Sequence, residues 1–363
     1  MTDVAQRNDD LTTWTDDLWQ AAVAGDEYAA TDAALAALDH GVDMETLLIE
    51  VVARVQARVG QEWAANRITV AQEHSATAVN ERVIAALALH PATRDAARAE
   101  PGRGRITVAC VDGEWHGLPA RLLAEVLRLR GWRVDHLGAQ VPTPHLIAHL
   151  HRTGPDAVAL SSSIATRLPA AHAAITACQA TGTPVLVGGA AFGLDGRYAR
   201  LLGADAWAPD ARAAADRLDG DLPAVAPASR HSTDDLPHLD DQEYTLVTRS
   251  ASRLVRHVMS ELEQRVPEMA RYTAQQRRHT AEDIAHLVDF LATALYLNDP
   301  ELFGGFLTWM AGILTARGVP ASVLHPALDL IASRLTEFPR ATATLAHARA
   351  ALRAAESRAA GPA

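Results

Sequence analysis

Two short motifs in the chain combine a carboxylate with histidine, the side chain that ligates metals and moves protons near neutral pH. Glu114 and His116 are separated by one residue, and Glu73 directly precedes His74. A carboxylate beside an imidazole can accept one ring N–H, which orients the ring and leaves the other nitrogen for a metal ion. A histidine in a polar loop or on a helix surface is more often simply exposed, so neither motif alone defines a site.

The composition narrows the chemistry that these histidines can serve. The 363 residues include 16 histidines and two cysteines but no lysine. The absence of lysine excludes Schiff-base chemistry and a phosphate-loop lysine. The two cysteines, Cys110 and Cys178, are too few for a disulfide scaffold or a cysteine-rich zinc site.

The charge and hydropathy of the chain exclude further classes. The formal net charge is −11, which disfavours binding to nucleic acid over a broad surface. The sequence lacks an apolar run of the ~18 residues that a membrane helix needs. Its N-terminus is polar and acidic, unlike a signal peptide. We therefore expect a cytoplasmic protein that contacts neither membrane nor nucleic acid directly.

The segment that contains His116 alternates short apolar runs with amphipathic stretches. Strands are predicted at 106–111, 133–137, 157–161, 184–187 and 204–208, and helices at 118–130, 144–151, 168–180 and 198–202. This alternation is typical of a flavodoxin-like, doubly wound parallel sheet. Ligands of such sheets bind at the carboxyl ends of the strands. The ends of the predicted strands carry the Glu114–His116 motif, Ser161 to Ser163, and the pair Gly188-Gly189.

These residues together resemble the cobalamin-binding domain family, over roughly 101–215 of a domain predicted to span 101–218. The family has an Asp-x-His motif after its first strand, where this chain has Glu114-Trp115-His116-Gly117. The resemblance implies that His116 replaces the nucleotide base below cobalt. It also implies a slot for the dimethylbenzimidazole tail, lined by small residues: Ser161, Ser163, Gly188 and Gly189. We expect Trp115 and Gly117 to contact the cofactor as well.

Two positions depart from the pattern of that family. Glu114 stands where most members have Asp, which keeps the charge. Pro119 stands where the pattern usually has Gly, which suits the start of a helix but alters the fit of the tail.

The N-terminal segment has helical periodicity and predicts a four-helix bundle over 10–92. In this segment Trp63 is followed, after nine residues, by Glu73-His74. On a bundle helix a tryptophan ordinarily packs in the core and a histidine ordinarily lies on the surface. The spacing, however, resembles the cap of adenosylcobalamin photoreceptors, the family that includes light-dependent repressors of carotenoid genes. The resemblance implies that Trp63 packs against the adenosyl group, that Glu73 contacts it, and that His74 can bind cobalt from above after photolysis.

The repressors of that family carry a helix-turn-helix domain before the cap. Only about ten residues precede the first expected helix here, so we predict an output other than direct DNA control. Corrinoid proteins that carry methyl groups share the bundle and the sheet domain but generally lack the Trp/Glu-His pattern. They are the first alternative.

A linker rich in Pro, Asp and Ser is predicted at 219–242, followed by an all-helical domain of five or six helices at 243–357. One helix is expected to begin at 279–282 with Thr280 as its N-cap, and another at Asp299-Pro300. A plain dimerisation bundle and a globin-like tetrapyrrole holder both fit this pattern. A haem would need an axial ligand, for which His279, His286 and His325 are the candidates.

The order of the three domains resembles the photocobilins, in which a cobalamin photoreceptor module precedes a globin-like domain that binds biliverdin. Both cysteines fall in the cobalamin domain, so biliverdin would be held non-covalently. Arginine can pair with its propionates and aromatic rings can stack on its plane. The candidates are Arg277, Arg278, His279, Asp289 and Trp309. The resemblance implies a light sensor, not an enzyme, which signals to an effector protein. Symmetric dimers are the default for such sensors, so we expect a homodimer or higher homo-oligomer.

Overall fold

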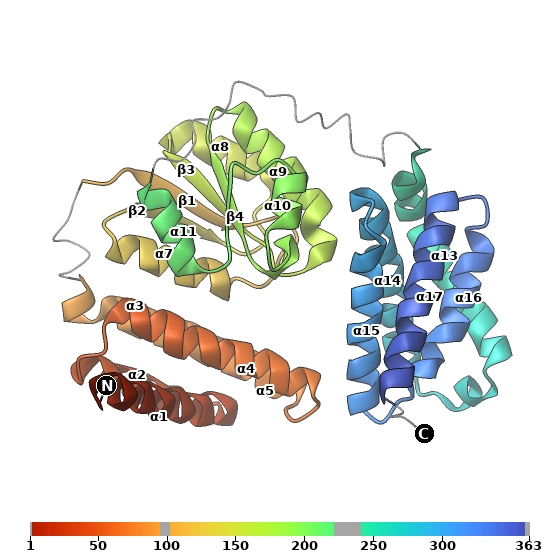
Figure 1. Cartoon of the computed structure of the whole chain (residues 1–363), viewed down its shortest axis with the longest axis horizontal. Coiled ribbons are helices and arrows are strands. Elements are labelled where there is room, and N and C mark those ends of the chain that lie inside the picture. Colours follow the sequence, from red (N-terminus) through yellow and green to blue (C-terminus); the bar gives the residue numbers. More distant parts are fainter. Residues whose placement is uncertain (1, 95–101, 221–240, 360–363) are drawn as a thin grey trace. The chain divides into compact units, whose positions relative to one another are not determined.

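The computed structural model describes residues 2–94, 102–220 and 241–359 (Figure 1). The chain divides into two compact units, 1–228 and 229–363. The first contains a helical bundle followed by a parallel sheet with helices, and the second is helical throughout its described part. Within the described residues, none of the helices combines the length and the apolar character needed to cross a membrane.

Four helical stretches form the bundle, as predicted. The third is continuous but contains a π-helical segment, η1, in its middle. The elements are α1 (Thr2–Ala24), α2 (Glu27–Asp39), α3 (Met44–Thr46), η1 (Leu47–Val52), α4 (Ala53–Ala64) and α5 (Val70–Leu89). The expectation that about ten residues precede the first helix was wrong, because α1 already begins at Thr2. Asp26 caps α2, and Thr69 with Gln72 forms a capping box on α5.

The sheet has five parallel strands in the order β2-β1-β3-β4-β5, the flavodoxin-like arrangement. The strands are β1 (Arg105–Cys110), β2 (Arg133–Gly138), β3 (Ala157–Ser161), β4 (Val185–Gly188) and β5 (Ala206–Ala208). The helices are α7 (Leu118–Leu129), α8 (Thr143–Thr153), α9 (Leu168–Ala180), α10 (Arg197–Leu201) and α11 (Ala211–Asp219). All strands were predicted to within about two residues. The order reverses between β1 and β3, so the loops that follow these strands meet at the switch point, where ligands of such sheets bind.

An apolar core continues from the bundle into the sheet domain through α5, η1 and α7. Salt bridges also join these two parts. Arg130, at the end of α7, donates to both oxygens of Glu45 at 2.9 and 3.0 Å. Arg212 of α11 donates to Glu45 and to Glu50 of η1, each at 3.0 Å. We call Glu45, Glu50, Arg130 and Arg212 the ionic clamp. The clamp ties the bundle to α7 and α11.

The second unit contains five α-helices in its described residues and is all-helical, as predicted. They are α13 (Glu243–Arg265), α14 (Ala274–Leu297), α15 (Pro300–Ala316), α16 (Leu324–Arg334) and α17 (Pro339–Ala359), with 3₁₀ turns η5 (Pro267–Arg271) and η6 (Ala321–Val323). The predicted helix start at 279–282 was wrong. Thr273 and Gln276 form a capping box ahead of α14, and the Thr280 hydroxyl donates to the Gln276 carbonyl within the helix. Asp299 does cap α15. Most of the predicted linker lies outside the described residues.

Candidate functional site

Glu114 and His116 form a close pair in the loop after β1. The His116 Nδ1 lies 2.6 Å from Glu114 Oε1, and the same oxygen accepts the His116 backbone N–H at 2.9 Å. A carboxylate can only accept, so the neutral imidazole carries its proton on Nδ1. The Nε2 is left with its lone pair on a side chain that is 55% exposed. This tautomer leaves Nε2 as the nitrogen that can ligate a metal.

The other oxygen of Glu114 binds the loop after β3. Glu114 Oε2 accepts hydrogen bonds from the Ser162 hydroxyl at 3.2 Å and from the backbone N–H groups of Ser163 and Ile164 at 2.6 and 3.1 Å. Glu114 is 1% exposed. Burial alone raises the pKa of a carboxyl, but these hydrogen bonds and those from His116 lower the pKa of Glu114 to about 2. Glu114 is therefore a buried anion that joins the two loops at the switch point.

The bundle contributes to the electrostatics of His116. The hydrogen bond to Glu114 raises the pKa of His116, burial opposes that shift, and the negative charges of Glu114 and Glu73 add to it. Glu73 belongs to α5, so a carboxylate of the cap acts on the imidazole of the sheet domain. Among the described residues, this effect of Glu73 on His116 links the Glu73-His74 motif to the Glu114–His116 motif.

The cap motif repeats the arrangement of the first pair. His74 Nδ1 is paired with Glu73 Oε2, and the imidazole is 75% exposed. Its Nε2 is thus the nitrogen that can bind a metal, as in His116. The side chain of Trp63 is partly buried and packs against the core of the bundle. A Cβ built at Gly60 would meet no atom within 4 Å, so the helix surface one turn before Trp63 is open.

The Cys110 thiol, which lies beside the Glu114–His116 motif, is inert. Cys110 ends β1, and its Sγ lies 3.6 Å from the His116 carbonyl oxygen, to which it donates. Burial raises the pKa of the Cys110 thiol to about 12, with a further contribution from the Glu114 charge. Burial raises the pKa of Cys178 to the same value. Neither cysteine is a reactive thiolate near neutral pH.

The small residues after β3 and β4 lie side by side, with Ser161 opposite Gly188 in the sheet. Gly189 has a φ of +100°, and a Cβ there would lie 2.3 Å from the Ser162 carbonyl oxygen. The packing of its own backbone thus requires glycine at position 189. The role of these residues and of Ser163 in lining a slot for the cofactor tail stays a prediction.

The remaining residues of the first motif lie at the surface and at the start of α7. Trp115 is 71% exposed. Gly117 is the N-cap of α7, and Pro119 occupies its first turn, which confirms that proline suits this helix start. Their contacts with a cofactor stay predictions.

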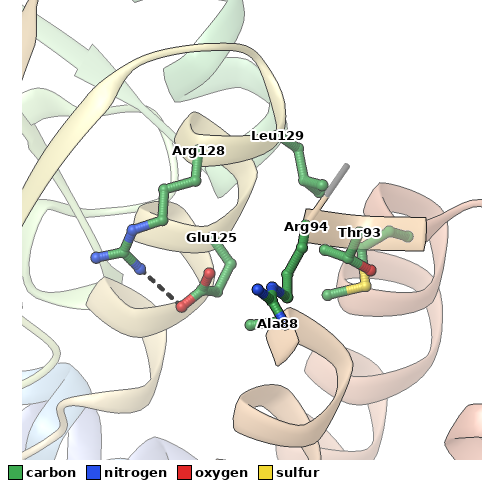
Figure 2. Close-up of a pocket in the computed structure, with 7 residues that line it drawn as sticks. Ala88, Thr93, Arg94, Glu125, Arg128 and Leu129 are labelled. Carbon is green, nitrogen blue, oxygen red and sulfur yellow. Dashed lines mark hydrogen bonds and ion pairs between the residues drawn. The ribbon is translucent and has the colours of Figure 1, made fainter. Parts of the chain in front are cut away.

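A cavity of about 180 Å³ lies elsewhere in this unit (Figure 2). Its lining includes Ala88 of α5, Thr93, Arg94, and Glu125 and Arg128 of α7. Arg128 donates to Glu125 at 2.7 Å (Figure 2). The cavity contains none of the predicted site residues, so it is distinct from the site around His116.

The five bilin candidates do not share one face. At roughly 100° per residue, eleven residues make about three helical turns, which places Arg278 with Asp289 and His279 with Phe290 on two different sides of α14. Arg277 is paired with Glu263 and donates to the Met269 carbonyl.

Trp309 of α15 lies near the side of α14 that carries His279 and Phe290. Phe290 and Phe306 are stacked with ring centroids 3.6 Å apart, and Phe306 lies 6.1 Å from Trp309. We call Phe290, Phe306 and Trp309 the aromatic group. Trp309 is 51% exposed. Sequence reasoning had selected only one member of this group.

Sequence reasoning also missed Ser162 as the anchor of Glu114. Its neighbours Ser161 and Ser163 were preferred, and three consecutive serines give no signal of which hydroxyl points at the carboxylate.

Comparison with known families indicates the cofactor. A family model described as "B12 binding domain" matches residues 104–218, and another with that description matches residues 14–88. The first unit is thus a cobalamin-binding module of a bundle and a flavodoxin-like domain.

Two curated relatives are similar to part of this chain. They are the HTH-type transcriptional repressors CarA and CarH of Myxococcus xanthus, which are 33% and 35% identical over 146 and 149 residues. These matches cover 37% and 39% of this chain and 48% and 46% of the relatives. The chain therefore spans about half the length of the curated relatives it matches.

Among solved structures, the Methanosarcina barkeri monomethylamine corrinoid protein is 19% identical with a TM-score of 0.49. That match covers 57% of this chain and 97% of the other.

Proposed function

We propose that the chain is a cytoplasmic photoreceptor that binds adenosylcobalamin between its bundle and its sheet domain. The observation that carries this proposal is the pair of matching His–carboxylate arrangements, Glu114 with His116 and Glu73 with His74. Each leaves one Nε2 free, and they come from the two segments that match B12-binding domains. His116 would hold cobalt through its Nε2, and His74 would be a second imidazole able to hold it.

The residues of the chain hold and orient the cofactor. Adenosylcobalamin, when bound, supplies a cobalt–carbon bond that visible light cleaves. His116 presents Nε2 to the lower face, and Glu114 fixes its tautomer and raises its basicity. Trp63 would pack against the adenosyl group, and Glu73 would accept hydrogen bonds from it.

Loss of the upper group removes a packing partner from the bundle. Without that packing partner the bundle would shift against the sheet domain, and His74 would be the residue able to hold the metal through Nε2. Such a change is a two-state element biased by a ligand. The ionic clamp at Glu45 and Glu50 restrains the other end of the helix that carries Trp63. The clamp thus favours a pivoting motion over separation of the two parts.

The second unit extends the range of wavelengths by binding biliverdin without a covalent bond. The aromatic group between α14 and α15 offers the stacking surface that a conjugated plane needs. The signal passes to an effector protein through a change of homo-oligomeric state.

An absorption spectrum tests the proposal. Protein supplied with adenosylcobalamin and biliverdin is measured in the dark and after green light. We expect a cobalamin spectrum that converts on illumination and a red bilin band that weakens in Trp309→Ala. The variant His116→Ala loses cobalamin retention, whereas His151→Ala, which removes an exposed histidine of α8, does not.

Three outcomes would redirect the proposal. Conversion without a red band would leave a cobalamin sensor with a structural helical domain. A Soret band would identify the second unit as a haem holder. Binding of methylcobalamin without any response to light would support a methyl carrier.

A further inference from the structure

A chain of hydrogen bonds runs from α5 to α4 and back to α5 beside the cap motif. Asn80 Nδ2 donates to Gln56 Oε1 at 2.9 Å, and Gln56 Nε2 donates to the Thr77 hydroxyl at 2.8 Å. The Thr77 hydroxyl donates in turn to Glu73 Oε1 at 3.2 Å. Every donor in this relay points toward Glu73, so the relay ends at the carboxylate as its acceptor.

The helical spacing places the relay on the same faces as the predicted cap residues. Glu73, Thr77 and Asn80 are four and three residues apart on α5, and Gln56 and Trp63 are seven apart on α4. Thr77 holds Oε1 of Glu73, and His74 Nδ1 holds Oε2. The position of the carboxylate is therefore set by its neighbours on the bundle.

Asn80 is unusual for its place in the core. It is 0% exposed and lies on the buried face of α5, between Val79 and Val83. Its Oδ1 is buried without a hydrogen-bond partner. A buried polar group with one unsatisfied atom lowers stability compared with an apolar residue. The Nδ2 group of Asn80 makes the first hydrogen bond of the relay.

We propose that Asn80, Gln56 and Thr77 are positioning residues that hold the Glu73 carboxylate as a fixed acceptor for the upper group of the cofactor. A fixed acceptor discriminates by hydrogen bonding. It favours a cobalamin whose upper group bears hydroxyl donors, such as adenosyl, over one that bears only an alkyl group. The proposal rests on the proposed function, because it assumes that cobalamin binds with its upper face toward Glu73.

The test compares the affinities of the apo-protein for adenosylcobalamin and methylcobalamin in the dark, in wild type and in Thr77→Val. Valine keeps the shape of threonine and removes the hydroxyl. We expect the preference for adenosylcobalamin over methylcobalamin to fall about tenfold, the effect of one hydrogen bond to a charged group. Thr77→Ser, which restores the hydroxyl, should recover the preference.

A matched control removes a hydroxyl that is not part of the relay. Thr31 of α2 is also partly buried, and its hydroxyl donates to the Glu27 carbonyl at 2.7 Å. Thr31→Val should leave the ratio of the two affinities unchanged. Thermal unfolding of each apo-protein shows whether either valine variant has lost the fold. Should Thr77→Val unfold, Gln56→Leu, which removes the preceding link, provides the same comparison.

The results separate the two proposals. If wild type binds neither cobalamin, or binds both equally, the proposed function fails as stated. If wild type prefers adenosylcobalamin and Thr77→Val keeps that preference, or weakens both ligands equally, the positioning role is wrong.

Discussion

Replacing Glu114 with glutamine perturbs the site at its buried anion. Glutamine has nearly the same shape, but its amide nitrogen is a donor. Facing the loop after β3, that nitrogen would meet the backbone N–H groups of Ser163 and Ile164, which also donate. Facing His116, it would meet the Nδ1–H and the backbone N–H of that residue. Glu114→Gln therefore leaves buried donors unsatisfied in either orientation.

The lowered pKa of Glu114 gives the size of the effect. Its value falls from 4.5 to about 2, and each pKa unit corresponds to ~1.4 kcal/mol. The ionised carboxylate thus contributes about 3 kcal/mol to the unfolding free energy near neutral pH. Because the folded pKa is depressed, this contribution is complete above pH 4.5 and is lost as the pH falls toward 2. At pH 3 the loss already amounts to about 2 kcal/mol.

Urea denaturation of the apo-protein at pH 7 and pH 3 measures the stability lost in Glu114→Gln and how that loss depends on pH. We expect Glu114→Gln to be about 3 kcal/mol less stable than wild type at pH 7, with a difference that shrinks by about 2 kcal/mol at pH 3. Glu81→Gln, at an exposed position of α5, is the matched control and should change little. A stability difference below about 1 kcal/mol at pH 7, or one that does not depend on pH, would show that Glu114 is not a stabilising buried anion.

Three further substitutions probe other parts of the first unit. Gly189→Ala should lower the unfolding free energy by about 2 kcal/mol or more, measured by urea denaturation, because the residue has a φ of +100° and its Cβ would clash with the Ser162 carbonyl. Burial, with smaller contributions from nearby arginines, lowers the pKa of His136 from 6.5 to about 4. The unfolded chain then binds more protons between these values, so wild type should lose up to about 3 kcal/mol as the pH falls from 6.5 to 4. His136→Phe should lack this contribution in the same titration. Glu45→Gln breaks the bidentate pair with Arg130 and should lower the unfolding free energy by about 1–2 kcal/mol. The difference between the variant and wild type should shrink as salt is added, because salt screens the wild-type ion pair.

The fold of the first unit could be predicted from the sequence because its signals are local. Strand β3 is buried along its whole length, so its five residues form a short apolar run ending in a serine. The Glu114–His116 pair could also be predicted, since residues two apart in a tight loop after a strand are close whatever the details of packing.

The details that were wrong or missed depend on competition between neighbouring helix-start signals and on side-chain packing. Thr273 and Gln276 have the spacing of a capping box, and that signal prevailed over Thr280 at the start of α14. Once α14 begins there, its helical period puts Arg277 and His279 on opposite sides. The relay from Asn80 to Glu73 leaves no pattern in the sequence, because a polar residue at a core position of a helix differs from its neighbours only in what it contacts.

We propose that His116 binds cobalt through Nε2, and electron paramagnetic resonance detects this ligand directly. Protein labelled with ¹⁵N only in histidine is loaded in the dark with unlabelled cob(II)alamin. If His116 is the lower ligand, the splitting from the axial nitrogen changes from a triplet to a doublet, and it is lost or returns to a triplet in His116→Ala. A triplet that persists in the labelled wild-type protein would show that the cofactor keeps its own base and that His116 is not the ligand.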